Sequence, residues 1–184
     1  MAKDPLGCSG YGIWFLWLLA SMIGLGVGWA LGWRLSFAVP GNLAIWVIGM
    51  VAGLSLGFFQ MLVLRPLLGA SIWWLLASMT GWAVGFFLGV QTASFFGFTE
   101  FVFGGVIGAG VGLALGIAQW FVLRGKMRSA GWWIPASVIA WAASLIVYLP
   151  GANALGLLYG GISGGISGLT LLALWLGIFK KAAN

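Results

Sequence analysis

The sequence predicts an all-α integral membrane protein in which six transmembrane helices form three tandem hairpins with a pseudo-threefold arrangement. Three observations lead to this fold class: the composition, the length of the apolar stretches and an internal repeat. Of the 184 residues, 62% are hydrophobic and only 5% are charged, whereas a soluble domain carries roughly a quarter charged residues. So few charges cannot cover a water-facing surface, and the chain is therefore expected to lie within a bilayer.

Six stretches are apolar enough and long enough to cross a membrane, which takes about 20 residues of helix. No stretch alternates apolar and polar residues as the strands of a β-barrel do, so helices are expected throughout. The fifth stretch is the shortest, and the sixth is long enough that it is expected to tilt. In chain order the expected spans are Ile13–Trp33, Leu43–Leu64, Ile72–Thr92, Phe101–Leu123, Trp132–Leu149 and Ala154–Phe179.

Turn signals separate the two helices of each hairpin. "VPGN" ends at Asn42 and "LPGAN" ends at Asn153. Pro and Gly break a helix, and Asn can cap the next one. In the middle hairpin Thr99 takes the capping position, and Glu100 follows, where an acid suits the positive end of the helix dipole.

An internal repeat relates the hairpins to one another. Gln60 begins "QMLVLRPLLGASIWWLLAS" and Gln119 begins "QWFVLRGKMRSAGWWIPAS", with Gln, Val-Leu-Arg, Trp-Trp and Ala-Ser at identical spacings. "WLLASM" occurs at Trp17 and again at Trp74, which extends the repeat to the first hairpin. Each hairpin crosses the membrane twice, so all copies point the same way. We expect one domain, 1–184, whose repeats over 13–65, 72–124 and 132–180 surround an axis along the membrane normal.

Small residues recur at every fourth position of the helices. This spacing forms one groove along a helix. Because lipid gives helices no hydrophobic reason to associate, close backbone contact must stabilise their packing. We expect these rows to form helix–helix seams; a flexible gating role is the alternative. The seam glycines are Gly24, Gly28, Gly49, Gly53, Gly57, Gly81, Gly85, Gly108, Gly112, Gly116, Gly160, Gly164 and Gly168.

The basic residues predict the orientation. With six spans, Arg34 is the only base on one side, and every other Lys and Arg lies on the side of the termini. Since cytoplasmic loops are enriched in Lys and Arg, both termini are expected to be cytoplasmic. The net charge of +6 is attributed to the orientation of the chain in the membrane and to contact with anionic lipid. No nucleic-acid partner is expected. The expected lipid-contacting residues are Arg65, Arg124, Lys126, Arg128, Lys180 and Lys181.

The ionisable residues argue against an enzyme. There is no His, and the only carboxylates, Asp4 and Glu100, are expected on opposite sides of the membrane, where they cannot form a general acid–base pair. Cys8 is the sole cysteine and cannot build a metal site or an internal disulfide by itself. Neither catalytic nor metal-binding residues are predicted.

Gln60 and Gln119 are the most informative polar residues, because each lies near the cytoplasmic end of its span. A buried amide is usually satisfied by an interhelical hydrogen bond. The alternative is that both glutamines face a common cavity and touch a ligand, an ion or a pigment metal. The third hairpin offers Thr170 in the corresponding region, but no Gln.

The tryptophans fall into two groups. One group lies near the cytoplasmic ends of the first, third and fifth spans, where aromatic belts are expected. Trp82 and Trp141 lie deeper and are candidates for lining a groove for an apolar cofactor: a lipid tail, a quinone, a carotenoid or another apolar pigment. Facing lipid or filling gaps is the alternative. The belt candidates are Trp14, Trp17, Trp73, Trp74, Trp132 and Trp133.

The phrases "QWFVLR", "SAGWWIPAS" and the following "AW" resemble a group of small bacterial multi-pass membrane proteins of unknown function, which carry Q-W-x-V-L-R and A-G-W-W-x-x-A-S phrases in tandem. The resemblance covers Gly49–Trp141 well, the first hairpin partly and the last weakly. It implies a bacterial origin, and so the inner (plasma) membrane. It implies no activity.

Two functions remain open from the sequence. The first is a structural or accessory subunit, a scaffold that packs against other membrane protein subunits and binds membrane lipids or apolar cofactors. The absence of charge inside the spans favours it, because ion and proton paths usually contain ionisable groups. The second is a channel or small-solute transporter built around the repeat axis. A water-accessible path lined by Gln60 and Gln119 would favour the second function, and a dry, glycine-packed centre the first.

Overall fold

The computed structural model describes residues 10–69, 72–127, 129–147 and 155–176, and these ranges are all-helical. They contain six α-helices and one short 3-10 helix, and no β-strand occurs within them. The expectation of an all-α fold with six helices is confirmed. The elements are α1 (Gly10–Ser36), α2 (Leu43–Leu68), α3 (Ile72–Phe95), α4 (Glu100–Leu123), η1 (Ala130–Trp132), α5 (Trp133–Leu145) and α6 (Leu155–Trp175).

Five of these helices, α1, α2, α3, α4 and α6, are long and apolar enough to cross a membrane. The chain is therefore a multi-pass membrane protein. The fifth expected span differs, because α5 has only 13 residues and a helix rises about 1.5 Å per residue against a hydrocarbon core of about 30 Å. Residues 148 and 149, the end of that expected span, lie outside the described ranges, as does Asn153.

The helix ends follow local chemistry only in part. Gly69 ends α2 in the left-handed conformation, with φ of +58°, and its N–H donates to the carbonyl of Arg65. This conformation favours glycine. Asn42 and Thr99 occupy the expected N-cap positions of α2 and α4, but neither side chain makes a capping hydrogen bond.

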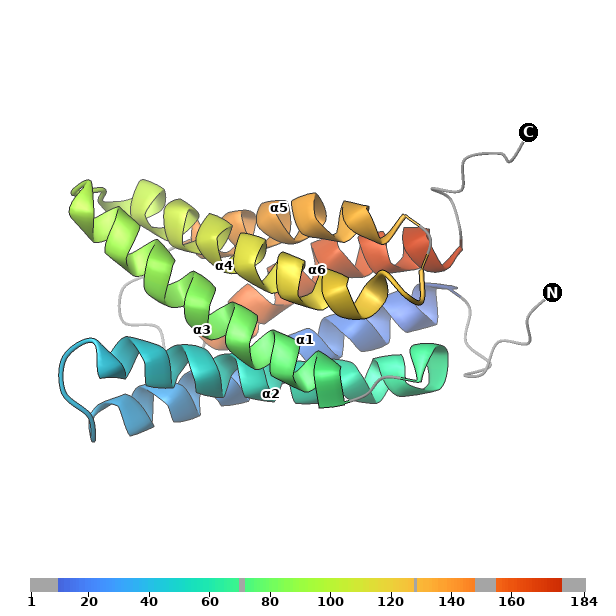
Figure 1. Cartoon of the computed structure of the whole chain (residues 1–184), viewed down its shortest axis with the longest axis horizontal. Coiled ribbons are helices and arrows are strands. Elements are labelled where there is room, and N and C mark those ends of the chain that lie inside the picture. The colour runs from blue at the N-terminus through green and yellow to red at the C-terminus, as the bar shows by residue number, and fades with distance from the viewer. Residues whose placement is uncertain (1–9, 70–71, 128, 148–154, 177–184) are drawn as a thin grey trace.

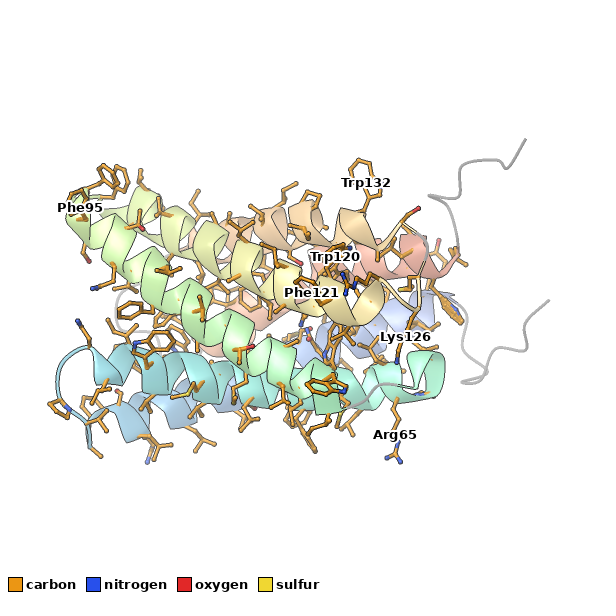
Figure 2. The ribbon with its side chains drawn as sticks, in the orientation of Figure 1. Arg65, Phe95, Trp120, Phe121, Lys126 and Trp132 are labelled. Atoms are coloured by element: carbon orange, nitrogen blue, oxygen red, sulfur yellow. The ribbon has the colours of Figure 1, made fainter. Side chains whose placement is uncertain are left out.

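The six helices form a closed ring. Each helix packs against the next along the chain, and α6 returns to pack against α1. Figure 1 shows the helices alternating in direction, with the starts of α1, α3 and α5 and the ends of α2, α4 and α6 at one end of the bundle. We call this the basic end, because Arg65, Arg124 and Lys126 lie there; Figure 2 shows Arg65 and Lys126 at that end and Phe95 at the opposite one.

Buried residues lie inside the ring, and large apolar side chains cover its outside. One core cluster contains Trp82, Trp141 and Tyr159, and a second, near the basic end, contains Trp17 and Trp133. An apolar exterior is what a lipid environment requires. Exposed large apolar residues occur on every long helix, for example Leu31, Leu54, Leu88, Leu113 and Leu169.

Glycines of each even-numbered helix lie against the backbone of the next odd-numbered helix. A Cβ added at Gly112 of α4 would lie 2.6 Å from Cα of Val138 in α5, and one at Gly160 of α6 would lie 2.8 Å from Cα of Met22 in α1. Such spacing leaves no room for a side chain, so these helices touch through their backbones. The other expected seam glycines on these helices are also close to the neighbouring helix: Gly49, Gly53 and Gly57 against α3, Gly108 and Gly116 against α5, and Gly164 and Gly168 against α1.

The odd-numbered helices α1 and α3 carry a second set of seams. A Cβ at Gly28 would lie 2.8 Å from Cα of Ala52, and one at Gly81 would lie 2.7 Å from Cα of Leu115. Gly24 and Gly85 continue these two seams. In α5, where the row carries no Gly, Ser144 donates a hydrogen bond to the carbonyl of Tyr159 in α6 at 3.0 Å.

Candidate functional site

Three tryptophans meet in the middle of the ring near the basic end. Trp17 of α1, Trp74 of α3 and Trp133 of α5 are all fully buried. Their ring centroids are 5.9 to 6.2 Å apart, and each pair packs edge to face, the arrangement that aromatic rings prefer. The odd-numbered helices are separated by even-numbered ones around the ring. The Trp triad, as we call these residues, therefore joins them across the interior.

The triad corrects part of the aromatic-belt expectation. Trp73 and Trp132 are 66% and 56% exposed, as belt residues should be, but their sequence neighbours Trp74 and Trp133 are about 1% exposed. Adjacent helical residues point about 100° apart. Only one tryptophan of each Trp-Trp pair can face lipid, and the other enters the core.

A polar layer lies one helical turn deeper than the triad and contains both predicted glutamines. Gln60 and Gln119 are 4% and 1% exposed. Nε2 of Gln60 donates to Oγ of Ser21 at 3.1 Å, and Nε2 of Gln119 donates to Oγ of Ser78 at 3.0 Å. A longer contact of 3.5 Å joins Nε2 of Gln119 to Oε1 of Gln60. The two copies of the repeated phrase thus meet inside the bundle.

Gln119 is the centre of this layer. Its Oε1 accepts a hydrogen bond from Nε1 of Trp133 at 2.9 Å. Its Nε2 donates one hydrogen to Oγ of Ser78 and the other to Oε1 of Gln60. An amide has two donor hydrogens and a carbonyl oxygen with two lone pairs, so three of the four hydrogen bonds that the Gln119 side chain can make are made to protein groups. Together with Ser21, the layer links α1, α2, α3, α4 and α5.

The third hairpin contributes Ser167 to the cluster rather than Thr170. Nε1 of Trp17 donates to Oγ of Ser167 at 3.0 Å, in the same manner as Trp133 donates to Gln119. Ser167 follows Gly164 by three residues, as Gln119 follows Gly116, and both glycines pack on a serine of the next helix. Sequence reasoning missed Ser167, although the offset from the seam glycine identifies it.

Two buried indole N–H groups have no hydrogen-bond partner within the described ranges. They belong to Trp74 and Trp82. Leaving such a donor unpaired costs roughly 1–3 kcal/mol. In the repeat, Trp74 corresponds to Trp133 and Gln60 corresponds to Gln119. Trp133 donates to Gln119, whereas the indole N–H of Trp74 makes no corresponding bond to Gln60.

Trp82 and Trp141 lie in the core rather than along an open groove. Both are buried, and their ring centroids are 5.4 Å apart with the rings nearly perpendicular. Trp29 and Phe86 pack beside Trp82, and Tyr159 contacts Trp29. These aromatic rings fill the middle of the bundle.

Three of the six expected lipid-contacting cations lie within the described ranges, and all three are exposed at the basic end. The guanidinium of Arg124 lies 4.7 Å from the ring centre of Phe121 and 5.4 Å from that of Trp120. Nζ of Lys126 donates to the carbonyl of Gly69 at 3.1 Å. Arg65 projects from the last turn of α2 (Figure 2). Arg128, Lys180 and Lys181 lie outside the described residues.

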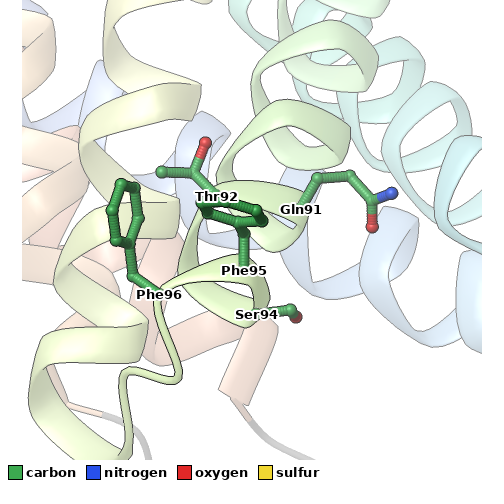
Figure 3. A pocket seen from close by; sticks show the side chains of 5 residues that line it. All are labelled: Gln91, Thr92, Ser94, Phe95 and Phe96. Carbon is green, nitrogen blue, oxygen red and sulfur yellow. The ribbon is translucent and has the colours of Figure 1, made fainter.

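The described residues line at least three recesses on the outer surface. One, of about 520 Å³, lies between α3 and α4 and runs from Thr80 to Lys126. A second, of about 450 Å³, lies between α1 and α6 and is lined by apolar residues and Gly161. A third, of about 600 Å³, lies at the end of α3, where Figure 3 shows Phe95 and Phe96 on one side and Gln91 and Ser94 on the other.

The chain was compared with known proteins at the level of family models, curated sequences and solved structures. None of these comparisons finds a significant match. The resemblance suggested by "QWFVLR" and "SAGWWIPAS" therefore remains an interpretation of the phrases themselves.

Proposed function

We propose that this chain is a non-catalytic scaffold or accessory subunit of a bacterial inner membrane, with both termini cytoplasmic. Its three hairpins form a pseudo-threefold bundle that packs against other membrane protein subunits and holds lipid on its outer surface. The observation that carries the proposal is the filled interior of the ring. A conduction path would run along the axis of the ring, and near the basic end the Trp triad occupies that axis.

The polar layer supports the same conclusion. A water path needs polar groups that face water, but both amide hydrogens and the carbonyl oxygen of Gln119 bond to protein groups, namely Ser78, Gln60 and Trp133. The described charged side chains lie at the ends of helices or in turns. Ion and proton pathways generally place ionisable groups within the membrane.

The alternative is a channel or small-solute transporter, and a flux assay tests it. The purified protein is reconstituted into liposomes, and efflux of protons, potassium and a small neutral solute is compared with that of protein-free vesicles. We expect no difference. A reproducible flux through the wild-type protein, abolished by Gln60→Leu without a loss of melting temperature, would establish the transporter instead.

The scaffold function is tested by what the bundle holds in the membrane. Crosslinking from the outward-facing position Leu113, which is 49% exposed, is expected to capture a second membrane protein in native membranes. Crosslinks to lipid alone, with no protein adduct at Leu113 or Leu54, would contradict the scaffold proposal.

A further inference from the structure

The groove between α3 and α4 differs from the other two recesses in combining an apolar trough with a cation. Trp73 in the first turn of α3 and Phe121 near the end of α4 form its walls, and Lys126 lies at its basic end. Between Trp73 and Thr80 the groove extends about 10 Å into the bilayer, taken from 1.5 Å of helix rise per residue. The hydroxyl of Thr80 already donates to the carbonyl of Leu76 at 2.7 Å, so the trough does not require a polar ligand.

The repeat shows which residue of this groove is particular to the middle hairpin. The floor of the groove includes Ala118. The corresponding residue is Phe59 in the first hairpin and, by the register of Gly116 with Gly164, Ile166 in the third. A methyl group thus stands where the other copies have a large side chain. α1 packs on α2 about as extensively as α3 packs on α4, whereas α5 and α6 contact each other less. Compared with the first hairpin, the small residue at Ala118 therefore leaves a hollow.

A lysine at the position of Lys126 occurs only in the middle copy of the repeat. Leu67 and Leu174 hold the positions that correspond to Lys126. The hydrogen bond from Nζ of Lys126 to the carbonyl of Gly69 places the ammonium beside the residue that ends α2. Arg124 stacks on the groove wall Phe121 at 4.7 Å. Two positive charges therefore lie at the basic end of an apolar trough.

We propose that the α3–α4 groove binds one anionic phospholipid, with an acyl chain against Ala118 and the phosphate beside Lys126. This proposal rests on the lipid-holding role of the proposed scaffold and assigns it a site. An acyl chain matches the apolar walls, and a phosphate matches an ammonium at the level of the headgroups. The other two recesses have no cation among their lining residues. Charge complementarity therefore favours this groove for an anionic lipid.

Native mass spectrometry of the protein in nanodiscs of equimolar phosphatidylglycerol and phosphatidylcholine tests the site. Lys126→Gln is expected to lower the phosphatidylglycerol adduct about fivefold, the equivalent of about 1 kcal/mol for one basic side chain, and to leave the phosphatidylcholine adduct unchanged. Ala118→Phe installs the residue of the first hairpin and should remove both adducts. Two matched controls make the same types of change outside the groove. Leu113→Phe should change neither adduct, and Arg65→Gln, which removes an expected lipid-contacting cation outside the groove, should lower the phosphatidylglycerol adduct less than Lys126→Gln does.

The outcomes separate this inference from the proposed function. Equal loss of phosphatidylglycerol in Lys126→Gln and Arg65→Gln would overturn the groove, because it would show a general surface-charge effect. Retention of the adduct by a folded Ala118→Phe variant would also overturn it. If Ala118→Phe fails to fold, the Lys126 and Arg65 pair decides the question. If the liposomes show flux and the lipid adduct is intact, the scaffold is rejected and the lipid site is not. If the groove variants fail the adduct test and the liposomes show no flux, the lipid site is rejected and the scaffold is not.

Discussion

Two glycines of α4 provide a direct test of the backbone seams. A Cβ at Gly112 would lie 2.6 Å from Cα of Val138, whereas ordinary contacts begin at 3.4 Å. The carbonyl oxygen of Ser137 is nearer still. Both neighbours belong to the backbone of α5, which cannot rotate away as a side chain can. At Gly105, on the same helix, the nearest atoms are side-chain carbons of Ile146 at 3.9 and 4.0 Å.

The expected stabilities of Gly112→Ala and Gly105→Ala follow from these distances. In both variants the gain in helix propensity is the same, about 0.5–1 kcal/mol, so it cancels when the two are compared. Gly112→Ala additionally separates α4 from α5, and overpacking of this kind costs about 1–3 kcal/mol. We therefore expect Gly105→Ala to be neutral or stabilised, and Gly112→Ala to be less stable than Gly105→Ala by about 1–3 kcal/mol.

The free energy of unfolding can be measured by titrating SDS into detergent micelles and following tryptophan fluorescence, to which the buried Trp triad contributes. Gly81→Ala serves as a second seam variant, because its Cβ would lie 2.7 Å from Cα of Leu115. Equal free energies of unfolding for Gly112→Ala and Gly105→Ala would refute the reasoning, since they would mean that α4 and α5 do not touch through their backbones.

Two further predictions concern the polar layer and the topology. Gln119→Leu should lower the free energy of unfolding by about 2 kcal/mol and Gln60→Leu by about 1 kcal/mol, because only the first leaves the indole N–H of Trp133 without its acceptor; equal melting temperatures for the two variants would contradict this. In a Cys8→Ser background, a membrane-impermeant thiol reagent should modify Gly125→Cys from the cytoplasmic side and Ala38→Cys from the opposite side, and labelling of both from one side would exclude the alternation of α1 to α4.

Composition and spacing determine much of this fold locally. A chain with 5% charged residues has no stable arrangement in water, and apolar stretches of the right length must become helices because lipid offers no partner for backbone polar groups. The expected ends of most helices agree with the structure within a few residues. The row Gly49, Gly53 and Gly57 lies on one face of α2 by helical geometry alone, so a seam along that face could be read from the sequence.

Tertiary structure decides what those faces meet. Trp73 and Trp74 have the same local sequence environment, and only the packing of α3 between α2 and α4 leaves one exposed and buries the other in the triad. Gln60 and Gln119 are 59 residues apart and bond to each other because the ring brings α2 and α4 together across the interior. Ser167 meets Trp17 only because α6 closes the ring against α1. The groove beside Ala118 likewise depends on the depth at which α3 and α4 pack, since spacing along one helix specifies a face but not the distance to the helix beside it.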